Sequence, residues 1–131
     1  MARATVLVAD DHTLVLERVV SLLKPSFDVV GTANNGEDVV LEAQRLKPDV
    51  IVLDITMPVL NGIEAAVELH ELGSTAKIVF LTVNEQVEFL DACIAEGANG
   101  YVTKNRLSTD LIPAINAALS GNVFISPFLH N

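Results

Sequence analysis

The residues in this sequence best suited to chemistry are polar side chains that follow directly on short apolar segments. Asp54 comes immediately after the run VIVL, and a proline and an Asn-Gly pair follow it closely. Asp10 and Asp11 come after the run TVLVA in the same way. Thr82 ends the run KIVFLT, and Lys104 follows GYVT. Three carboxylates, one hydroxyl and one ammonium therefore stand at the ends of separate strand-like segments.

Carboxylates gathered in one place repel each other and raise one another's pKa unless a positive charge lies among them. A divalent cation supplies that charge, and Mg²⁺ prefers one or two carboxylates together with water and phosphate oxygens. We expect Asp11 and Asp54 to bind Mg²⁺ directly and Asp10 to bind it through water. The backbone carbonyl of Thr56 is a candidate for a further ligand. His12, beside Asp11, is a candidate neighbour of this pocket.

A metal ion held in this way can clamp a phosphoryl group and offset the charge that develops during its transfer. Asp54 is the best candidate for the nucleophile, because no cysteine, Ser-His pair or glycine-rich phosphate loop is predicted at the same place. Carboxylates also form acyl phosphates in other phosphoryl-transfer proteins. Lys104 supplies a positive charge and Thr82 a hydroxyl donor for oxygens of the phosphoryl group. Because acyl phosphates are labile, the modification would be temporary.

Each of these residues also has an ordinary structural interpretation. Asp10 and Asp11 could cap a following helix, since aspartate is favoured at helix N-termini. A lone aspartate at the end of a strand, such as Asp54, is usually a turn residue. Thr82 could be an ordinary strand residue and Lys104 a solvated lysine. The chemical interpretation is the stronger one because all five residues occupy equivalent positions in the predicted sheet.

The spacing of apolar residues predicts the elements that position this set. Short segments rich in Val, Ile, Phe and Tyr predict five strands, at residues 5–9, 27–33, 50–53, 77–82 and 100–103. Apolar residues at helical spacing predict five helices, near residues 12–23, 36–46, 62–71, 85–96 and 109–120. This alternation predicts an α/β domain with a parallel sheet, helices on both faces and right-handed crossovers. Ligands of such sheets bind at the carboxyl ends of the strands, so the polar residues share one edge.

Composition and charge narrow the class of protein. With 131 residues, half of them hydrophobic, the chain has the length of one domain with a sizeable core. A formal net charge of −9 argues against direct binding to nucleic acid, so any contact with DNA needs another domain. The apolar runs are too short to span a membrane and the N-terminus lacks a signal-peptide pattern, so we expect a cytoplasmic protein without membrane contact. A single cysteine, Cys93, excludes an internal disulfide and a cysteine-based metal site.

Four motifs carry a resemblance to a known family. VADDH, LDITMPVLNG, FLTV and GYVTKN, in this order and at these spacings, resemble the receiver domain of two-component response regulators. The resemblance covers roughly residues 4–121. It implies a (βα)5 flavodoxin-like fold, which is a doubly wound parallel five-stranded sheet with the strand order 2-1-3-4-5.

The resemblance also implies roles for single residues. Asp54 would receive phosphate from a phosphohistidine of a sensor histidine kinase, and Asp10 and Asp11 would form the acidic Mg²⁺ pocket. Thr82 and Tyr101 would report phosphorylation by moving together, with the hydroxyl swinging toward the phosphate and the ring turning inward. Packing alone is the alternative explanation for an aromatic residue at the position of Tyr101.

The C-terminal part, GANGYVTKN followed by LIPAINAALSGNVFISP, is similar to receivers of the NarL/FixJ group, which precede a LuxR-type helix-turn-helix domain. We therefore predict a receiver domain at residues 1–121 and the start of a linker at residues 122–131. DNA would be bound only through a domain outside this chain. Phosphorylation of the receiver would favour a homodimer or release that domain, and so regulate transcription.

The predicted role is that of a signalling domain, which catalyses only its own phosphorylation and dephosphorylation. Three alternatives remain open at this point: a stand-alone receiver, a phosphate-independent interaction module and an aspartyl phosphatase. Such phosphatases commonly carry a second carboxylate two residues after the nucleophile. Thr56 occupies that position here, which argues against the phosphatase.

Overall fold

The computed structural model describes residues 3–83 and 87–127, apart from the side chains of residues 87–90. The strands are β1 (Thr5–Ala9), β2 (Asp28–Ala33), β3 (Val50–Asp54), β4 (Lys77–Thr82), β5 (Gly100–Thr103) and β6 (Phe124–Ile125). The helices are α1 (Thr13–Leu23), α2 (Gly36–Leu46), α3 (Gly62–Glu71), α4 (Val87–Ala95) and α5 (Leu107–Leu119), with a 3₁₀ turn η1 (Lys104–Arg106) before α5. None of the helices within the described ranges combines the length and the apolar character needed to cross a membrane.

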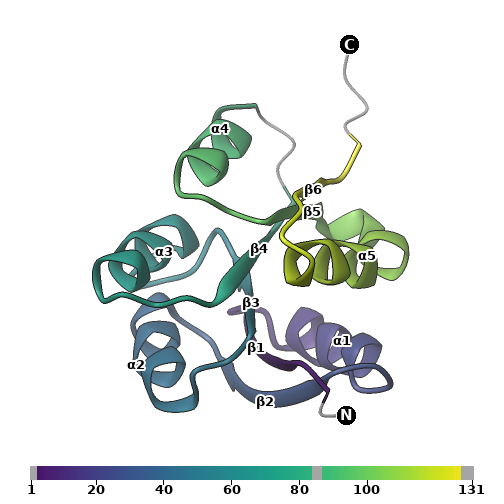
Figure 1. Cartoon of the computed structure of the whole chain (residues 1–131), viewed down its shortest axis with the longest axis horizontal. Coiled ribbons are helices and arrows are strands. Elements are labelled where there is room, and N and C mark those ends of the chain that lie inside the picture. The colour runs from purple at the N-terminus through teal and green to yellow at the C-terminus, as the bar shows by residue number, and fades with distance from the viewer. Residues whose placement is uncertain (1–2, 84–86, 128–131) are drawn as a thin grey trace.

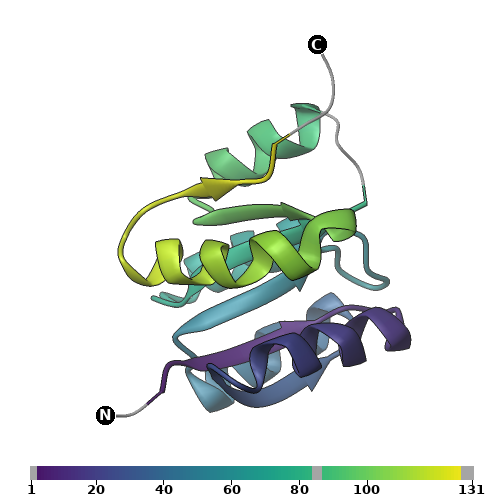
Figure 2. The ribbon, with the colours of Figure 1, turned by 90° about the vertical axis from the view of Figure 1, so that its right-hand side faces the viewer.

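These strands form one parallel sheet in the order β2-β1-β3-β4-β5-β6. Helices α1 and α5 cover one face of the sheet, and α2, α3 and α4 cover the other (Figures 1 and 2). Every predicted strand and helix is present in chain order. The predicted doubly wound α/β fold with strand order 2-1-3-4-5 is therefore confirmed, with one strand added at its edge.

Side chains alternate along each strand and so divide the core in two. In β1, Val6 and Val8 pack in the cluster that includes residues of α1 and α5. Leu7 and Ala9 pack in the cluster that includes residues of α2 and α3. The central strand β3 is buried along its whole length, as a parallel sheet covered on both faces requires. Polar groups with access to solvent can therefore emerge only at the strand ends.

The Asn-Gly pair that follows Asp54 sets the point where α3 begins. The Asn61 side chain accepts a hydrogen bond from the Glu64 amide at 2.8 Å, and the Glu64 side chain accepts one from the Asn61 amide at 2.9 Å. This is a capping box. Gly62 lies against the carbonyl oxygen of Asp54, where a side chain would not fit. The loop between β3 and α3 is therefore fixed close to the carboxylate at both ends.

Strand β6 was not predicted. It lies within residues 122–131, which the sequence indicated as the start of a linker. In the structure Phe124 pairs with Gly100 and Ile125 with Tyr101, so that β6 extends the sheet next to β5. Part of this segment therefore belongs to the sheet. That the chain continues into a linker stays a prediction.

Candidate functional site

The carboxyl edge of the sheet gathers the acidic residues that the sequence indicated. Asp10, Asp11, His12 and Asp54 each offer one ligand atom, and these atoms all lie within 4.8 Å of one another. Asp10 and Asp54 are buried, whereas Asp11 and His12 are exposed. The cluster is thus closed on the side of the protein and open on the side of the solvent.

This set of donors fits a small divalent cation. Mg²⁺ binds carboxylate oxygens and keeps several waters, and the exposed side of the cluster leaves room for those waters. The predicted grouping of Asp10, Asp11 and Asp54 is therefore what the chain forms, and their role as ligands stays a prediction. At Thr56 the observed contact comes from the amide, which donates to Asp54 Oδ1 at 3.3 Å. The carbonyl of Thr56 as a ligand also stays a prediction.

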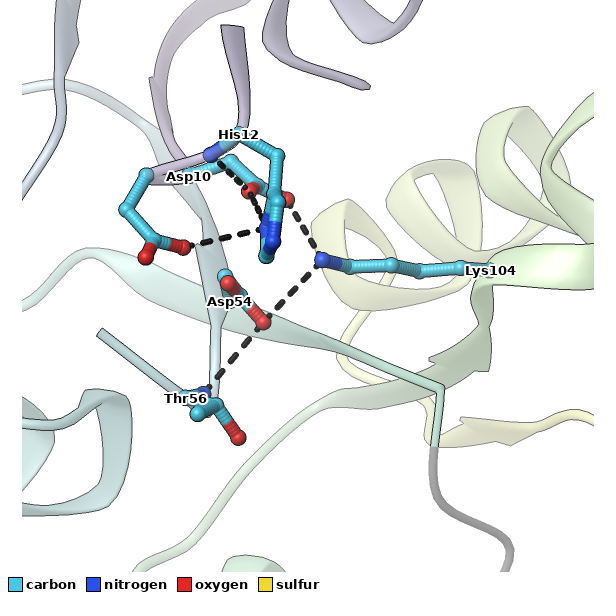
Figure 3. Close-up of polar contacts among 6 residues, drawn as sticks. Asp10, His12, Asp54, Thr56 and Lys104 are labelled. Carbon is cyan, nitrogen blue, oxygen red and sulfur yellow. Dashed lines mark hydrogen bonds and ion pairs between the residues drawn. The ribbon is translucent and has the colours of Figure 1, made fainter. Parts of the chain in front are cut away.

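Lys104 brings a positive charge into the cluster (Figure 3). Its Nζ lies 2.7 Å from Asp10 Oδ2 and 3.3 Å from Asp54 Oδ1. The lysine side chain is only 10% exposed, so these ion pairs are screened less than surface pairs. Asp10 Oδ2 accepts no other hydrogen bond in the described part of the chain, which leaves Lys104 as the group that neutralises it. Lys104 is therefore a paired cation that is mostly shielded from solvent.

The two carboxylate oxygens of Asp54 have different surroundings. Oδ1 contacts Lys104 and accepts from the Thr56 amide. Oδ2 is buried and has no hydrogen-bond partner among the residues that the structure describes. Burial and, after it, the negative charge of Asp10 raise the pKa of Asp54 to about 6, against the lowering effect of Lys104. Because a buried oxygen without a partner costs free energy, this carboxylate is disposed to take a further ligand.

His12 connects the two aspartates at the start of α1. Its Nδ1 lies 3.3 Å from Asp10 Oδ1 and 3.2 Å from Asp11 Oδ1, and its amide donates to Asp10 Oδ1 at 2.8 Å. His12 is also the N-cap residue of α1. Neither aspartate therefore occupies the N-cap position that the alternative interpretation gave them. The suggested contact of His12 with the acidic pocket is present.

Thr82 and Tyr101, the predicted switch residues, are both buried. Thr82 ends β4, and Tyr101 lies in the core on the side of α2 and α3. Tyr101 is thus a packed residue, and its role as a switch stays a prediction. The sequence analysis overlooked Thr103, the neighbour of Thr82 on β5, whose buried Oγ1 lacks a hydrogen-bond partner among the described residues. The signal was available, because KIVFLT and GYVT both end in threonine.

A doubly wound parallel sheet with an acidic cluster and a lysine at its carboxyl edge defines a receiver-type domain. The family model described as "Response regulator receiver domain" matches residues 6–116. The chain therefore belongs to the response regulator receiver domain family, and the relatives below place it in the NarL/FixJ type.

Two curated relatives and one solved structure support this type. The chain is 36% identical over 128 residues to the nitrate/nitrite response regulator protein NarL of Escherichia coli K12. That alignment covers 96% of this chain and 59% of NarL. It is 36% identical over 124 residues to the transcriptional regulatory protein YdfI of Bacillus subtilis. That alignment covers 93% of this chain and 58% of YdfI. A LuxR-family two-component response regulator from Aurantimonas has a TM-score of 0.90 and 31% identity, over 96% of this chain and 91% of that chain. The chain spans less than two thirds of the length of these curated relatives.

Proposed function

We propose that this chain is a phosphoacceptor domain of two-component signalling and that Asp54 accepts the phosphoryl group. The donor is a phosphohistidine of a sensor histidine kinase. A carboxylate oxygen of Asp54 bonds to phosphorus while the P–N bond to the imidazole breaks, and the imidazole nitrogen keeps the electrons of that bond. The product is an acyl phosphate, which water later hydrolyses.

The environment of Asp54 is the observation that carries this proposal. The residue ends a fully buried strand, and one of its oxygens lacks a partner among the described residues. A lysine ammonium lies 3.3 Å from the other oxygen, and Asp10 and Asp11 belong to the same cluster. Asp54 Oδ1 also accepts from the amide two residues on, as a turn aspartate does, but an ordinary turn aspartate is solvated, whereas Asp54 is buried beside a lysine. This arrangement instead suits an oxygen that must react with a strongly anionic group.

The remaining residues of the site would each hold one part of the reacting group. Asp10, Asp11 and Asp54 fit Mg²⁺, which when bound supplies positive charge to the phosphoryl oxygens. The ammonium of Lys104 would bind a second phosphoryl oxygen, and the hydroxyl of Thr82 would donate to a third. Because the pKa of Asp54 is about 6, its carboxylate is mostly ionised, and therefore nucleophilic, above pH 7.

Phosphorylation would then act as a switch between two conformations. Movement of Thr82 and Tyr101 would change the face built from α4, β5 and α5, and that face would control homodimer formation or an attached DNA-binding domain. The similarity to YdfI, a transcriptional regulatory protein, supports such an output. The net charge of −9 favours DNA contact through that other domain and not through this one. We place the domain in the cytoplasm, where it would meet the kinase.

The test is phosphorylation by acetyl phosphate in the presence of Mg²⁺, followed by intact-protein mass spectrometry. The wild type is expected to gain one phosphoryl group that hydroxylamine removes, and Asp54→Asn is expected to gain none. Asp28→Asn replaces an exposed aspartate of β2 and should behave as the wild type. Wild-type phosphorylation of Asp54→Asn would reject Asp54 as the acceptor. An unmodified wild type would favour the phosphate-independent interaction module.

A further inference from the structure

The segment that follows α5 returns to the sheet and covers the edge of β5 (Figure 2). The Phe124 amide donates to the Asn99 carbonyl at 3.1 Å, and the Ser126 amide donates to the Tyr101 carbonyl at 2.8 Å. The Phe124 side chain packs against the core cluster that contains α5. Without this segment β5 would be an open edge with unpaired backbone groups. We call residues 122–127 the docking strap.

Two polar side chains are buried where the docking strap meets α5. Ser126 is 1% exposed and Asp110, on α5, is 4% exposed. Ser126 Oγ donates to Asp110 Oδ2 at 2.6 Å and accepts from the Thr103 amide at 3.2 Å. One hydroxyl therefore joins the docking strap to α5 and to β5 at the same time.

Asp110 is held in its charged form at this position. Arg106 Nε donates to Asp110 Oδ2 at 2.8 Å, and Thr109 Oγ1 donates to Oδ1 at 3.2 Å. Burial acts to raise the pKa of Asp110, but the hydrogen bonds from Arg106, Ser126 and Thr109 outweigh it and lower the pKa. A hydrogen bond to a buried charged oxygen is stronger than one between neutral groups. Because β6 has only two residues, the Ser126–Asp110 bond is a main anchor of the docking strap.

This anchor is connected to the phosphoacceptor site through β5 and η1. Thr103, whose amide donates to Ser126, directly precedes Lys104. Arg106, which donates to Asp110, ends the 3₁₀ turn that Lys104 begins. The Thr103 amide, before the lysine, thus contacts Ser126 of the docking strap, and the Arg106 side chain, after it, contacts Asp110, to which Ser126 is bonded. A displacement of the Lys104 backbone would therefore move groups that contact Ser126 or Asp110.

We propose that the docking strap is coupled to the site of phosphorylation, and that phosphorylation of Asp54 loosens it. While Lys104 is paired with the acidic cluster, the Ser126–Asp110 bond keeps residues 122–127 on β5 and α5. This coupling rests on the function proposed above for Asp54. Loosening would free residues 122–127 from the edge of β5 and from α5.

The direction of the coupling follows from competition for one ammonium group. A phosphoryl group on Asp54 attracts Lys104 more strongly than a carboxylate does, because it carries more charge. The end of β5 then shifts with the lysine backbone, and the Thr103 amide moves relative to Ser126 Oγ. That bond is already the longer of the two that Ser126 Oγ makes, 3.2 Å against 2.6 Å, and is therefore the one to weaken first.

Amide hydrogen exchange measured by NMR on the full chain tests the coupling, with Mg²⁺ present and with or without beryllium trifluoride as a stable mimic of the phosphoryl group. The amides of Phe124 and Ser126 are expected to exchange about tenfold faster when the mimic is bound, which is a usual size for coupling between sites. Amides of β1 and β3 should not change. Unchanged exchange at Phe124 and Ser126 with the mimic bound would overturn the coupling and leave the proposed phosphorylation intact.

Coupling is reciprocal, so loosening the docking strap by mutation must strengthen binding of the mimic. Ser126→Ala removes the hydroxyl and leaves Arg106 and Thr109 on Asp110, so the domain keeps its fold. We expect about tenfold faster exchange of the docking strap without the mimic and about tenfold tighter binding of the mimic. Asp110→Asn should act in the same direction.

Ser108→Ala is the matched control, because Ser108 is an exposed serine on the same helix. It should match the wild type in both measurements. Slow, wild-type exchange of the docking strap in Ser126→Ala would show that the Ser126–Asp110 bond is not an anchor, and would overturn the proposal on that ground alone. Failure of the mimic to bind the wild type would overturn both the coupling and the phosphoacceptor function.

Discussion

Replacing Asp54 by asparagine is expected to stabilise the domain at neutral pH. Burial and the charge of Asp10 raise the pKa of Asp54 from its ordinary 3.8 to about 6. A carboxyl whose pKa is higher in the folded than in the unfolded state binds more protons when folded, so stability falls as the pH rises. The fall begins near the ordinary pKa and is complete about one pH unit above the folded value. Above pH 7 Asp54 is ionised, and its burial therefore lowers the free energy of unfolding by the full amount.

The size of this cost follows from the pKa. A rise from 3.8 to about 6 corresponds to about 3 kcal/mol, at 1.36 kcal/mol for each pH unit. Asparagine carries no charge and removes this cost. Its buried amide lacks some hydrogen-bond partners at the same position, which costs about 1 kcal/mol. We therefore expect Asp54→Asn to raise the free energy of unfolding by about 2 kcal/mol at pH 7.5. At pH 5 the gain should be smaller, because the folded wild type is then mostly protonated.

Urea unfolding followed by circular dichroism measures this difference, with a chelator present to remove divalent cations. Wild type, Asp54→Asn and Asp28→Asn are compared at pH 5 and pH 7.5. The exposed Asp28 serves as the control, and its variant should follow the wild type at both values. Equal stability of wild type and Asp54→Asn at pH 7.5, or a larger gain at pH 5, would refute the electrostatic reasoning.

Three further predictions concern the same edge of the sheet. Lys104→Met leaves the buried carboxylates of Asp10 and Asp54 without their cation. In the same urea assay it should lower the free energy of unfolding by about 3 kcal/mol at pH 7.5, and by less at pH 5. Mg²⁺ at ten times its dissociation constant should stabilise the wild type by about 1.4 kcal/mol in calorimetry, and Asp11→Asn much less. Val59 is exposed and β-branched with a φ of 71°, so Val59→Gly should gain about 1 kcal/mol by thermal unfolding; a loss would show that the loop needs the valine.

Much of the fold could be predicted because capping residues and apolar spacing indicate where its helices and strands begin and end. The strand at residues 77–82 and the helices at 36–46 and 62–71 have the predicted bounds. Both of these helices begin after an asparagine that caps them, and the apolar spacing inside them is regular. Helix α5 begins at Leu107, two residues earlier than predicted, because Leu107 is buried in the core and extends the apolar face.

Strand β6 could not be predicted for an equally physical reason. Two residues are too few to show the alternation that identifies a strand. The segment is held by contacts with distant parts of the chain, such as the bond from Ser126 to Asp110, sixteen residues away. These contacts exist only after α5 and β5 have packed. The residue pattern of 122–131 alone therefore cannot predict these contacts.

Part of the candidate site could likewise be predicted from the sequence, and part of it could not. That Asp10, Asp54 and Lys104 would meet could be predicted, because the carboxyl ends of parallel strands share one edge. Which atoms pair could not, since the pairing depends on rotamers set by packing. Thr56 is an example: the structure shows its amide donating to Asp54, a contact that the sequence did not indicate, and its carbonyl as a ligand stays a prediction.

The charges of the site also argue for an order of binding under the proposed function. Among the residues that the structure describes, Lys104 is the lysine or arginine that forms ion pairs with the carboxylates of Asp10, Asp11 and Asp54, and it contacts two of the three. A phosphoryl group would bring further negative charge to these carboxylates and would be repelled by them. Under the proposed function, a divalent cation would therefore bind to the cluster before the phosphoryl group approaches. The negative charge that raises the pKa of Asp54 would also attract this cation. Variants that relieve this charge should therefore become more stable and less reactive together.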